Sequence, residues 1–196
     1  MKKIVIIGSP GAGKTTFARK LSPILNIKVY HLDRLFWESC WKAKARDQRI
    51  DILQDIVREK QWIIEGTYLK SSEPRLEAAD TIIFLDMPPL LCLQCIVKRH
   101  LKYHGRSRCD IPEGCTDKLT LLRVLKVLAF PFREGRTLKK KLRNYESKQI
   151  IRLHSSKEAE AFLAQLEQDG DDNKQRSNLE LSPPPQLVLS RAIMSA

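Results

Sequence analysis

The chain lacks a long hydrophobic run, because no stretch approaches the 18 consecutive apolar residues that a membrane-spanning helix needs. After Met1-Lys2-Lys3, the first apolar run is short and stops at Gly8, so we expect neither a membrane span nor a signal peptide. Regular cysteine spacing is also missing, since the 5 cysteines are an odd number without a repeat. This usage argues against a disulfide framework, and we expect a cytoplasmic protein.

Acidic residues are few relative to basic ones: 23 Asp and Glu accompany 35 Lys and Arg, which gives a net charge of +12. Residues 96–148 alone hold 15 basic and 5 acidic residues, a net +10. Such a surface attracts polyanions, and two hypotheses compete for it: arginines that close over phosphates in an active site, or a nucleic-acid footprint. A solvated helix face is the third interpretation, above all for residues 138–143.

What the sequence does contain is the stretch GSPGAGKTT, which fits the template G-x-x-x-x-G-K-[ST]. A strand-like run precedes it and a helix-like run follows. In such a loop, glycines let backbone N–H groups approach phosphate oxygens, and the helix N-terminus faces the same anion. The alternative is a glycine-rich turn before an ordinary helix. We predict an ATP-binding loop made of Gly8, Ser9, Pro10, Gly11, Ala12, Gly13, Lys14, Thr15 and Thr16. Lys14 is predicted to contact the β- and γ-phosphates and Thr15 to bind Mg²⁺.

Strand-like and helix-like patterns alternate along the chain, which predicts an α/β protein with strands buried on both faces. We expect the three-layer P-loop NTPase fold, a five-stranded parallel sheet flanked by helices, with a small helical lid insertion. The expected strands are 3–8, 27–32, 62–66, 80–86 and 148–155. The expected helices are 15–26, 46–61, 89–105, 117–130, 136–146 and 156–167, with Pro23 kinking or ending the first one.

One domain accounts for the length of the chain. We assign residues 1–167 to a P-loop kinase-like domain whose lid region spans about 99–136. Ser155 and Glu158 predict a capping box for the last helix. Residues 168–196 have no sustained period and contain a triple proline, so we expect a disordered tail.

Polar residues follow the expected strands, and ligands of parallel sheets bind outside the carboxyl ends of the strands. Asp33 and Glu65 are candidates to orient a nucleophile or to hold Mg²⁺, with Gly66 beside the acceptor. For Asp33 the alternative is a helix cap, and for Glu65 a surface turn. Asp86 is interpreted as a turn residue at the end of its strand.

Three arginines, Arg99, Arg106 and Arg108, flank Gly105 at a helix end, where a mobile segment can close over phosphates. Attraction of a cation to the helix C-terminus is the alternative for Arg99. Cys92 and Cys95 form a C-x-x-C, but they lie in an apolar helical run, where a buried cysteine behaves as a small hydrophobe, so we favour this interpretation over a structural zinc site.

Five segments, GSPGAGKTT, YHLDRLFW, WIIEGTY, RLEAADTIIFLDMP and GRSRCDIPEGC, in this order resemble the FlaR-type DNA topology modulation proteins. These are similar to the adenylate kinase and shikimate kinase branch of P-loop kinases. The resemblance covers Met1 to about Leu166. It implies that Lys14 binds phosphate, that Thr15 binds Mg²⁺ and that Arg75 faces the acceptor. It also implies that Arg99, Arg106 and Arg108 belong to the lid. Glu65 stands where the family usually has Asp.

Our functional hypothesis is an ATP- and Mg²⁺-dependent phosphotransferase, a nucleotide or nucleoside kinase-like enzyme acting on a small acceptor. Catalytic roles are expected for Lys14, Asp33, Arg99, Arg106 and Arg108, and the acceptor is expected at Asp33, Glu65, Gly66 and Arg75. The alternative is a DNA-binding regulator that uses the nucleotide as a switch. It is not favoured, because the arginines group beside a loop and no DNA-reading motif is present. A nucleotide is a possible acceptor, and a monomer or homodimer is expected.

Overall fold

A computed structural model describes residues 1–102 and 119–180, with side chains as far as Asp171. The strands are β1 (Lys3–Gly8), β2 (Val29–His31), β3 (Trp37–Glu38), β4 (Lys42–Ala43), β5 (Trp62–Glu65), β6 (Thr81–Leu85) and β7 (Gln149–Leu153). The α-helices are α1 (Lys14–Leu25), α2 (Leu32–Phe36), α3 (Arg46–Arg58), α4 (Glu73–Ala78), α5 (Pro89–Lys102), α6 (Leu121–Ala129), α7 (Glu134–Leu142) and α8 (Ser156–Glu180). Short 3₁₀ turns are η1 (Ser39–Trp41), η2 (Leu69–Ser71) and η3 (Arg143–Tyr145).

The main sheet has five parallel strands in the order β2-β5-β1-β6-β7. β1 lies at its centre, where Val5 pairs with Ile64 of β5 on one side and with Ile82 of β6 on the other. Because all five strands point the same way, their carboxyl ends meet at one edge of the sheet. The predicted five-stranded parallel sheet flanked by helices is confirmed.

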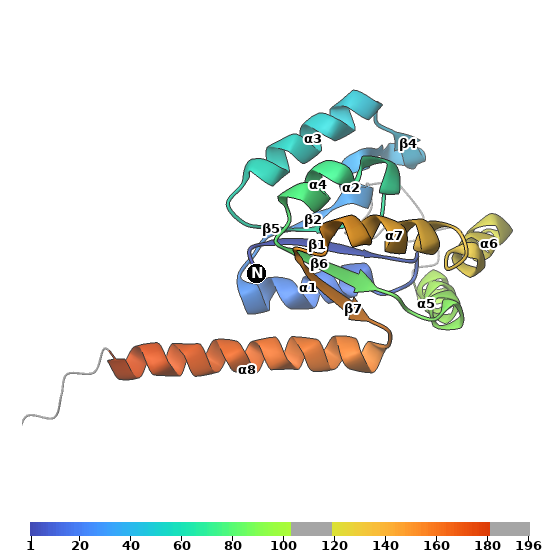
Figure 1. The fold of residues 1–196 in the computed structure, drawn as a ribbon. Helices are drawn as coiled ribbons and strands as arrows, with labels where there is room; N and C mark the ends of the chain where they lie inside the picture. Colours follow the sequence, from blue (N-terminus) through green and yellow to red (C-terminus); the bar gives the residue numbers. More distant parts are fainter. Residues whose placement is uncertain (103–118, 181–196) are drawn as a thin grey trace, which may run out of the picture.

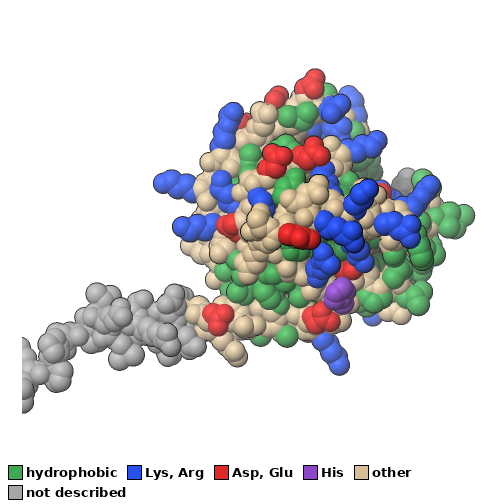
Figure 2. All heavy atoms as spheres, viewed as in Figure 1, with side chains coloured by type: hydrophobic (Ala, Val, Ile, Leu, Met, Phe, Trp, Pro, Cys, Tyr) green, Lys and Arg blue, Asp and Glu red, His purple; other side chains and the backbone are tan. Residues whose placement is uncertain are grey.

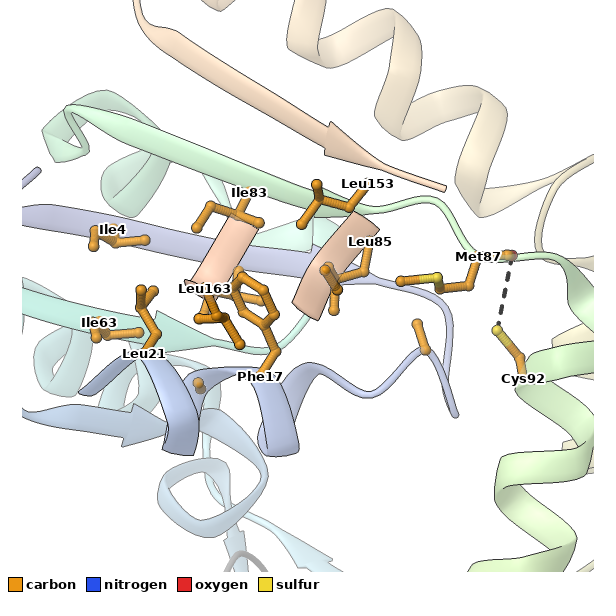
Figure 3. Close-up of a cluster of buried hydrophobic side chains, with 14 of the residues drawn as sticks. Ile4, Phe17, Leu21, Ile63, Ile83, Leu85, Met87, Cys92, Leu153 and Leu163 are labelled. Carbon is orange, nitrogen blue, oxygen red and sulfur yellow. Dashed lines mark hydrogen bonds between the residues drawn. The ribbon is translucent and has the colours of Figure 1, made fainter. Parts of the chain in front are cut away.

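Two apolar clusters fill the two faces of this sheet. Alternation along β1 directs Ile4 and Ile6 into one cluster and Val5 and Ile7 into the other. Figure 3 shows the first cluster, in which Phe17 and Leu21 of α1 pack with strand side chains, with Leu163 of α8 and with Met87. The central strands β1, β5 and β6 are buried on both faces, which explains why they consist mainly of continuous apolar residues, whereas the edge strands β2 and β7 are partly exposed.

The helices form the outer two layers. In Figure 1, α1 and α8 lie below the sheet, whereas α3, α4 and α7 lie above it and α5 and α6 lie beyond its carboxyl edge. The packing agrees, since Ala159 and Leu163 of α8 belong to the first cluster and Leu53, Leu76 and Leu138 belong to the second. Of the described helices, none is long and apolar enough to cross a membrane.

Several boundaries differ from the predicted ones. α1 continues through Pro23 to Leu25 and ends at Asn26, which has φ 54°. A proline near the end of a helix removes one hydrogen bond without ending it. The hairpin β3–β4 and the helix α4 were not predicted, because strands of two residues are too short for a periodic pattern and α4 is only 6 residues long.

The last helix is longer than predicted. Ser155 caps it as expected: its Oγ accepts the Glu158 N–H at 3.2 Å, and the Glu158 carboxylate accepts the His154 N–H at 2.9 Å. α8 then continues to Glu180, so residues 168–180 are helical where the sequence analysis expected disorder. Asp, Asn, Gln, Arg and Lys are tolerated in helices, and the next proline in the sequence is Pro183. Residues 181–196 lie outside the described residues.

The predicted lid region is described in part. α6 and α7 fall within or near the helices predicted there, and Thr120 caps α6 by accepting the Arg123 N–H at 3.3 Å. Residues 103–118 lie outside the described part of the chain, so the lid remains a prediction.

Truncation of the chain tests how α8 contributes to stability. Leu163 is 6% exposed and Leu166 packs against the same cluster, whereas the described residues from Gln168 to Asp171 are exposed. We expect truncation after Glu167 to change the melting temperature by less than about 2 °C. Truncation after Phe162, which removes both leucines, should lower it by about 5 °C or more. Equal effects in thermal unfolding would contradict this assignment.

Candidate functional site

The loop between β1 and α1 wraps around a point just beyond the end of β1. Gly11 has φ +82°, and a Cβ on it would lie 2.3 Å from the Cys92 carbonyl oxygen, so the loop packs directly on the backbone of α5. Gly13, at φ +86°, immediately precedes α1. The first turn of α1 leaves backbone N–H groups without intrahelical partners. Loop and helix together therefore form a structure suited to binding phosphate.

Lys14 reaches back across this loop. Its Nζ donates to the carbonyl oxygens of Gly8, at 3.1 Å, and Ser9, at 2.9 Å. Burial lowers the pKa of Lys14, while the carboxylates of Glu65 and Asp33 act to raise it. The ammonium group is thus held inside the loop with two carboxylates near enough to stabilise its charge.

Glu65 ends β5 and is only 4% exposed, so the surface-turn interpretation is wrong. Its Oε1 accepts the Thr15 hydroxyl at 3.1 Å and lies 2.9 Å from His31 Nδ1. Burial alone would raise the pKa of Glu65. The hydrogen bond with His31 and the charge of Lys14 outweigh that effect and hold the pKa below its ordinary value. Glu65 is therefore a buried, ionised carboxylate.

The donor atoms at this point fit Mg²⁺. Thr15 gives its hydroxyl proton to Glu65, which leaves lone pairs of Thr15 Oγ1 available to a cation. Mg²⁺ is usually bound through one or two protein oxygens together with substrate phosphates and water. Within the described ranges, no three His, Cys, Asp or Glu side chains converge into a larger metal-binding cluster. A site built on Thr15 and Glu65 matches that preference.

Asp33 lies in the first turn of α2 and makes no capping bond, since His31 occupies the N-cap position without a side-chain bond. Asp33 Oδ1 instead accepts the Tyr68 hydroxyl at 2.5 Å, and that hydroxyl accepts Trp37 Nε1–H at 2.7 Å. Burial, followed by the charge of Asp33, raises the pKa of Tyr68, which keeps the phenol protonated as a donor. The helix-cap alternative for Asp33 is therefore wrong, and the aromatic pair Trp37 and Tyr68 fixes its orientation.

Arg75, on α4, is fully buried. Its Nη2 donates to the Thr67 carbonyl at 2.5 Å, and its Nε and Nη1 have no hydrogen-bond partner. Burial lowers the pKa of Arg75 to about 10, and Glu65 and Tyr68 act in the opposite direction. Gly66 lies between Glu65 and Thr67 in the chain, and its N–H donates to the Ile6 carbonyl oxygen at 3.1 Å. Arg75 is a buried cation next to the site, not an open surface residue.

The arginines predicted for the lid divide into two groups. Arg99 lies in the last turn of α5, and its charge acts to lower the pKa of Lys14, which places it near the phosphate loop. Arg106 and Arg108 lie outside the described residues. The structure thus brings Lys14, Thr15, Asp33 and Glu65 together, with Arg75 and Arg99 beside them.

Figure 2 shows Lys and Arg side chains gathered over α7. Three lysines of α6 and α7 are paired within the chain: Lys139 with Asp86 at 2.7 Å, Lys141 with Glu73 at 2.8 Å and Lys126 with Glu134 at 3.7 Å. Asp86 also donates its N–H to Leu153 O at 2.9 Å. Asp86 therefore lies directly after β6 and binds Lys139 of α7, so part of the basic stretch is used in folding.

The cysteines of the C-x-x-C lie on different faces of α5. Cys92 is buried and its thiol donates to Met87 O at 3.8 Å, which Figure 3 marks, whereas Cys95 is exposed. Cys92 also contributes to the packing of the phosphate loop through its carbonyl group.

Sequence reasoning missed His31 and Thr67. His31 is the last residue of β2, and Thr67 follows β5 after Gly66, so the strand-end rule that selected Asp33 and Glu65 applied to both. Thr67 Oγ1 bonds Gly8, donating to its oxygen at 2.5 Å and accepting its N–H at 3.2 Å. Neither residue belongs to the phosphate-loop template, and polar residues at strand ends are too common to be selected by position alone.

Solved structures of other proteins share this architecture. A shikimate kinase from Acinetobacter baumannii in complex with shikimate matches with a TM-score of 0.53 and 14% identity, over 93% of this chain and 96% of that chain. The fold is that of the P-loop kinases. A shikimate kinase from Bacteroides thetaiotaomicron matches with a TM-score of 0.44 and 18% identity, over 91% of this chain and 98% of that chain. A deoxyadenosine kinase from M. mycoides matches with a TM-score of 0.44 and 14% identity, over 89% of this chain and 98% of that chain. No protein-family model matches the chain, and no curated protein matches it in sequence.

The charge of Glu65 predicts how stability depends on pH. Because its pKa is lowered in the folded protein, its ionised form stabilises the fold fully above the ordinary value of 4.5 and progressively less as pH falls below it. We expect Glu65→Gln to be less stable than the unmodified protein at pH 7, with the difference shrinking at pH 3.5. Urea unfolding at both pH values measures this. Glu158→Gln removes an exposed carboxylate and should change stability less, and a pH-independent difference for Glu65→Gln would contradict the assignment.

Proposed function

We propose that this protein is an ATP-dependent phosphotransferase that moves the γ-phosphoryl group to the hydroxyl of a small anionic acceptor. The observation that carries the proposal is the convergence of Lys14, Thr15, Glu65 and Asp33 at the carboxyl ends of β1, β2 and β5. Phosphoryl transfer needs positioning and charge neutralisation more than covalent chemistry. These residues supply a cation, metal-binding oxygens and a carboxylate in one place.

Lys14 and the loop N–H groups would hold the β- and γ-phosphates of ATP. Thr15 and Glu65 would hold Mg²⁺, which, when bound, neutralises charge on the phosphate oxygens. Arg99, next to Lys14, adds a further positive charge on the side of α5. We retain Arg106 and Arg108 as predicted lid residues with the same role.

Asp33 would orient the acceptor. In this role one oxygen, Oδ1, stays bonded to Tyr68 while Oδ2 accepts the proton of the acceptor hydroxyl. The acceptor oxygen then forms a bond to the γ-phosphorus as the bond to the β-γ bridging oxygen breaks, and ADP leaves. Because Tyr68 and Trp37 hold the carboxylate in place, little reorientation is needed for this transfer.

Arg75 supports an anionic acceptor. No Asp or Glu lies within ion-pair distance of its guanidinium among the described residues, and two of its nitrogens have no partner. A buried cation without a close counterion is costly, so an anionic group near it is stabilised. Carboxylates and phosphates both match the guanidinium geometry.

The resemblance to FlaR-type proteins keeps a second candidate function open: a DNA-binding regulator switched by the nucleotide. The net charge of +10 over residues 96–148 favours it. Pairing of Lys126, Lys139 and Lys141 with acidic side chains reduces the charge that is available for DNA. We therefore favour the phosphotransferase, and the cytoplasmic location remains a prediction.

Lys14→Ala tests the phosphate loop. Loss of a charged contact to phosphate should weaken MgATP binding by about tenfold or more. Because Lys14 also helps to stabilise the buried Glu65 carboxylate, the melting temperature should fall while the fold is kept. Lys20→Ala is the matched control on the same helix, because Lys20 is exposed and, within the described part of the chain, forms an ion pair with the exposed Glu160 at 3.8 Å. Isothermal titration of both variants measures the difference, and equal affinities would refute the role of Lys14.

Asp33→Asn separates an enzyme from a switch. If Asp33 accepts the acceptor proton, the substitution should keep MgATP affinity and lower turnover by roughly a hundredfold or more. Asp51→Asn, on the exposed face of α3, is the control. Single-turnover phosphate transfer measures the rates. An unchanged rate for Asp33→Asn would refute the role of Asp33, whereas no transfer by the unmodified chain to any acceptor would favour the DNA-binding alternative.

The acceptor class is tested with matched compounds that differ only in an anionic group. Nucleoside monophosphates are compared with nucleosides, and shikimate with its methyl ester, in an assay for ADP release. We expect stimulation by the anionic member of at least one pair and little by its neutral partner. If the protein binds DNA in a salt-sensitive way and no compound stimulates ADP release, the DNA-binding function would be favoured over the phosphotransferase.

A further inference from the structure

Thr67 lies between the phosphate loop and α4, and it bonds both. Its Oγ1 donates to the Gly8 carbonyl at 2.5 Å and accepts the Gly8 N–H at 3.2 Å. Its own carbonyl accepts Nη2 of the buried Arg75 at 2.5 Å. The backbone N–H and carbonyl of Gly8 are therefore both hydrogen-bonded to the Thr67 side chain, which lies just after the end of β5.

The Gly8 carbonyl is shared with Lys14. Its oxygen accepts the Thr67 hydroxyl and also Lys14 Nζ, which lies at 3.1 Å. A carbonyl oxygen has two lone pairs, so it accepts both donors at once. Lys14 Nζ also donates to the Ser9 carbonyl at 2.9 Å, and Ser9 is joined to Gly8 by the peptide bond that contains the Gly8 carbonyl. By holding this carbonyl, Thr67 therefore helps to set the position of the Lys14 ammonium.

The segment that carries Thr67 is itself tightly held. The next residue, Tyr68, has φ 24°, an unusual value for a residue other than glycine. Its hydroxyl is fixed by Asp33 and Trp37, and its ring packs edge-on against Phe36 with centroids 5.0 Å apart. Arg75 fixes Thr67 from the other side. Backbone strain of this kind persists where the surrounding contacts impose it.

We propose that Thr67 is a positioning residue: its hydroxyl fixes the Gly8 peptide and, through that carbonyl, the phosphate-binding ammonium of Lys14. The inference rests on the proposed function, since Thr67 has this role only if the same loop binds the phosphates of ATP. Thr67 contacts no phosphate in this role and acts only through Gly8 and Lys14.

The test compares Thr67→Val, which keeps the shape and removes the hydroxyl, with Thr67→Ser, which keeps the hydroxyl. We expect Thr67→Val to weaken MgATP binding by about tenfold. Thr67→Ser should stay within about threefold of the unmodified chain. Thr81→Val is the matched control, because Thr81 is 1% exposed and its hydroxyl bonds Asp80 and Gln149 at the opposite end of β6. It should lower the melting temperature without changing MgATP affinity.

A double-mutant cycle with Lys14→Ala shows whether the effect passes through the lysine. Titration of MgATP to millimolar concentration is used so that weak binding is measured. Thr67→Val should change affinity little once Lys14 is absent, because the two effects are not additive when one residue acts through the other. Additive effects, equal losses for Thr67→Val and Thr67→Ser, or unchanged affinity for Thr67→Val would each overturn the inference. Absence of MgATP binding by the unmodified chain would overturn the proposed function as well.

Discussion

Glu65 carries an ionised carboxylate at the end of a strand whose other residues are all buried and apolar, and the rest of the site is arranged around that charge. A carboxylate in such a place is stable only when its charge and hydrogen bonds are satisfied. The side chains that do so come from two other elements: Thr15 and Lys14 from α1, and His31 from β2. The need to neutralise one buried charge therefore draws the phosphate loop and two strands to a common point.

The parallel sheet makes this arrangement possible. The three central strands, β1, β5 and β6, are apolar between their ends because both faces are covered, so their polar side chains appear only where the strands begin or end. β1, β2 and β5 are adjacent, and their ends deliver the loop, His31 and Asp33, and Glu65 to neighbouring positions. At the same edge of the sheet, the ion pair between Lys139 and Asp86 joins α7 to the end of β6.

Much of the fold was predictable from sequence because its signals are local. Continuous Ile and Val runs identified the strands, and the phosphate-loop template identified Lys14 and Thr15. The burial of Arg75 was not predictable, since an arginine on a short helix has no sequence signal for the interior. The hairpin at Trp37 was missed for a related reason: its turn places Cys40 and Trp41 at φ 59°, and neither residue type is typical of that conformation. Thr67 and His31 depend on contacts between distant segments, which no local pattern contains.

The contact between Gly11 and α5 limits how this sequence can diverge. The phosphate-loop template leaves position 11 open to any residue, yet here even the smallest side chain would meet the Cys92 carbonyl at 2.3 Å. A substitution at Gly11 would require α5 to shift, and α5 carries Arg99 at its far end. Evolutionary freedom at a position that the motif does not constrain is thus removed by its tertiary neighbour. Homologues with a larger residue there should also differ in the length or placement of the helix that follows β6.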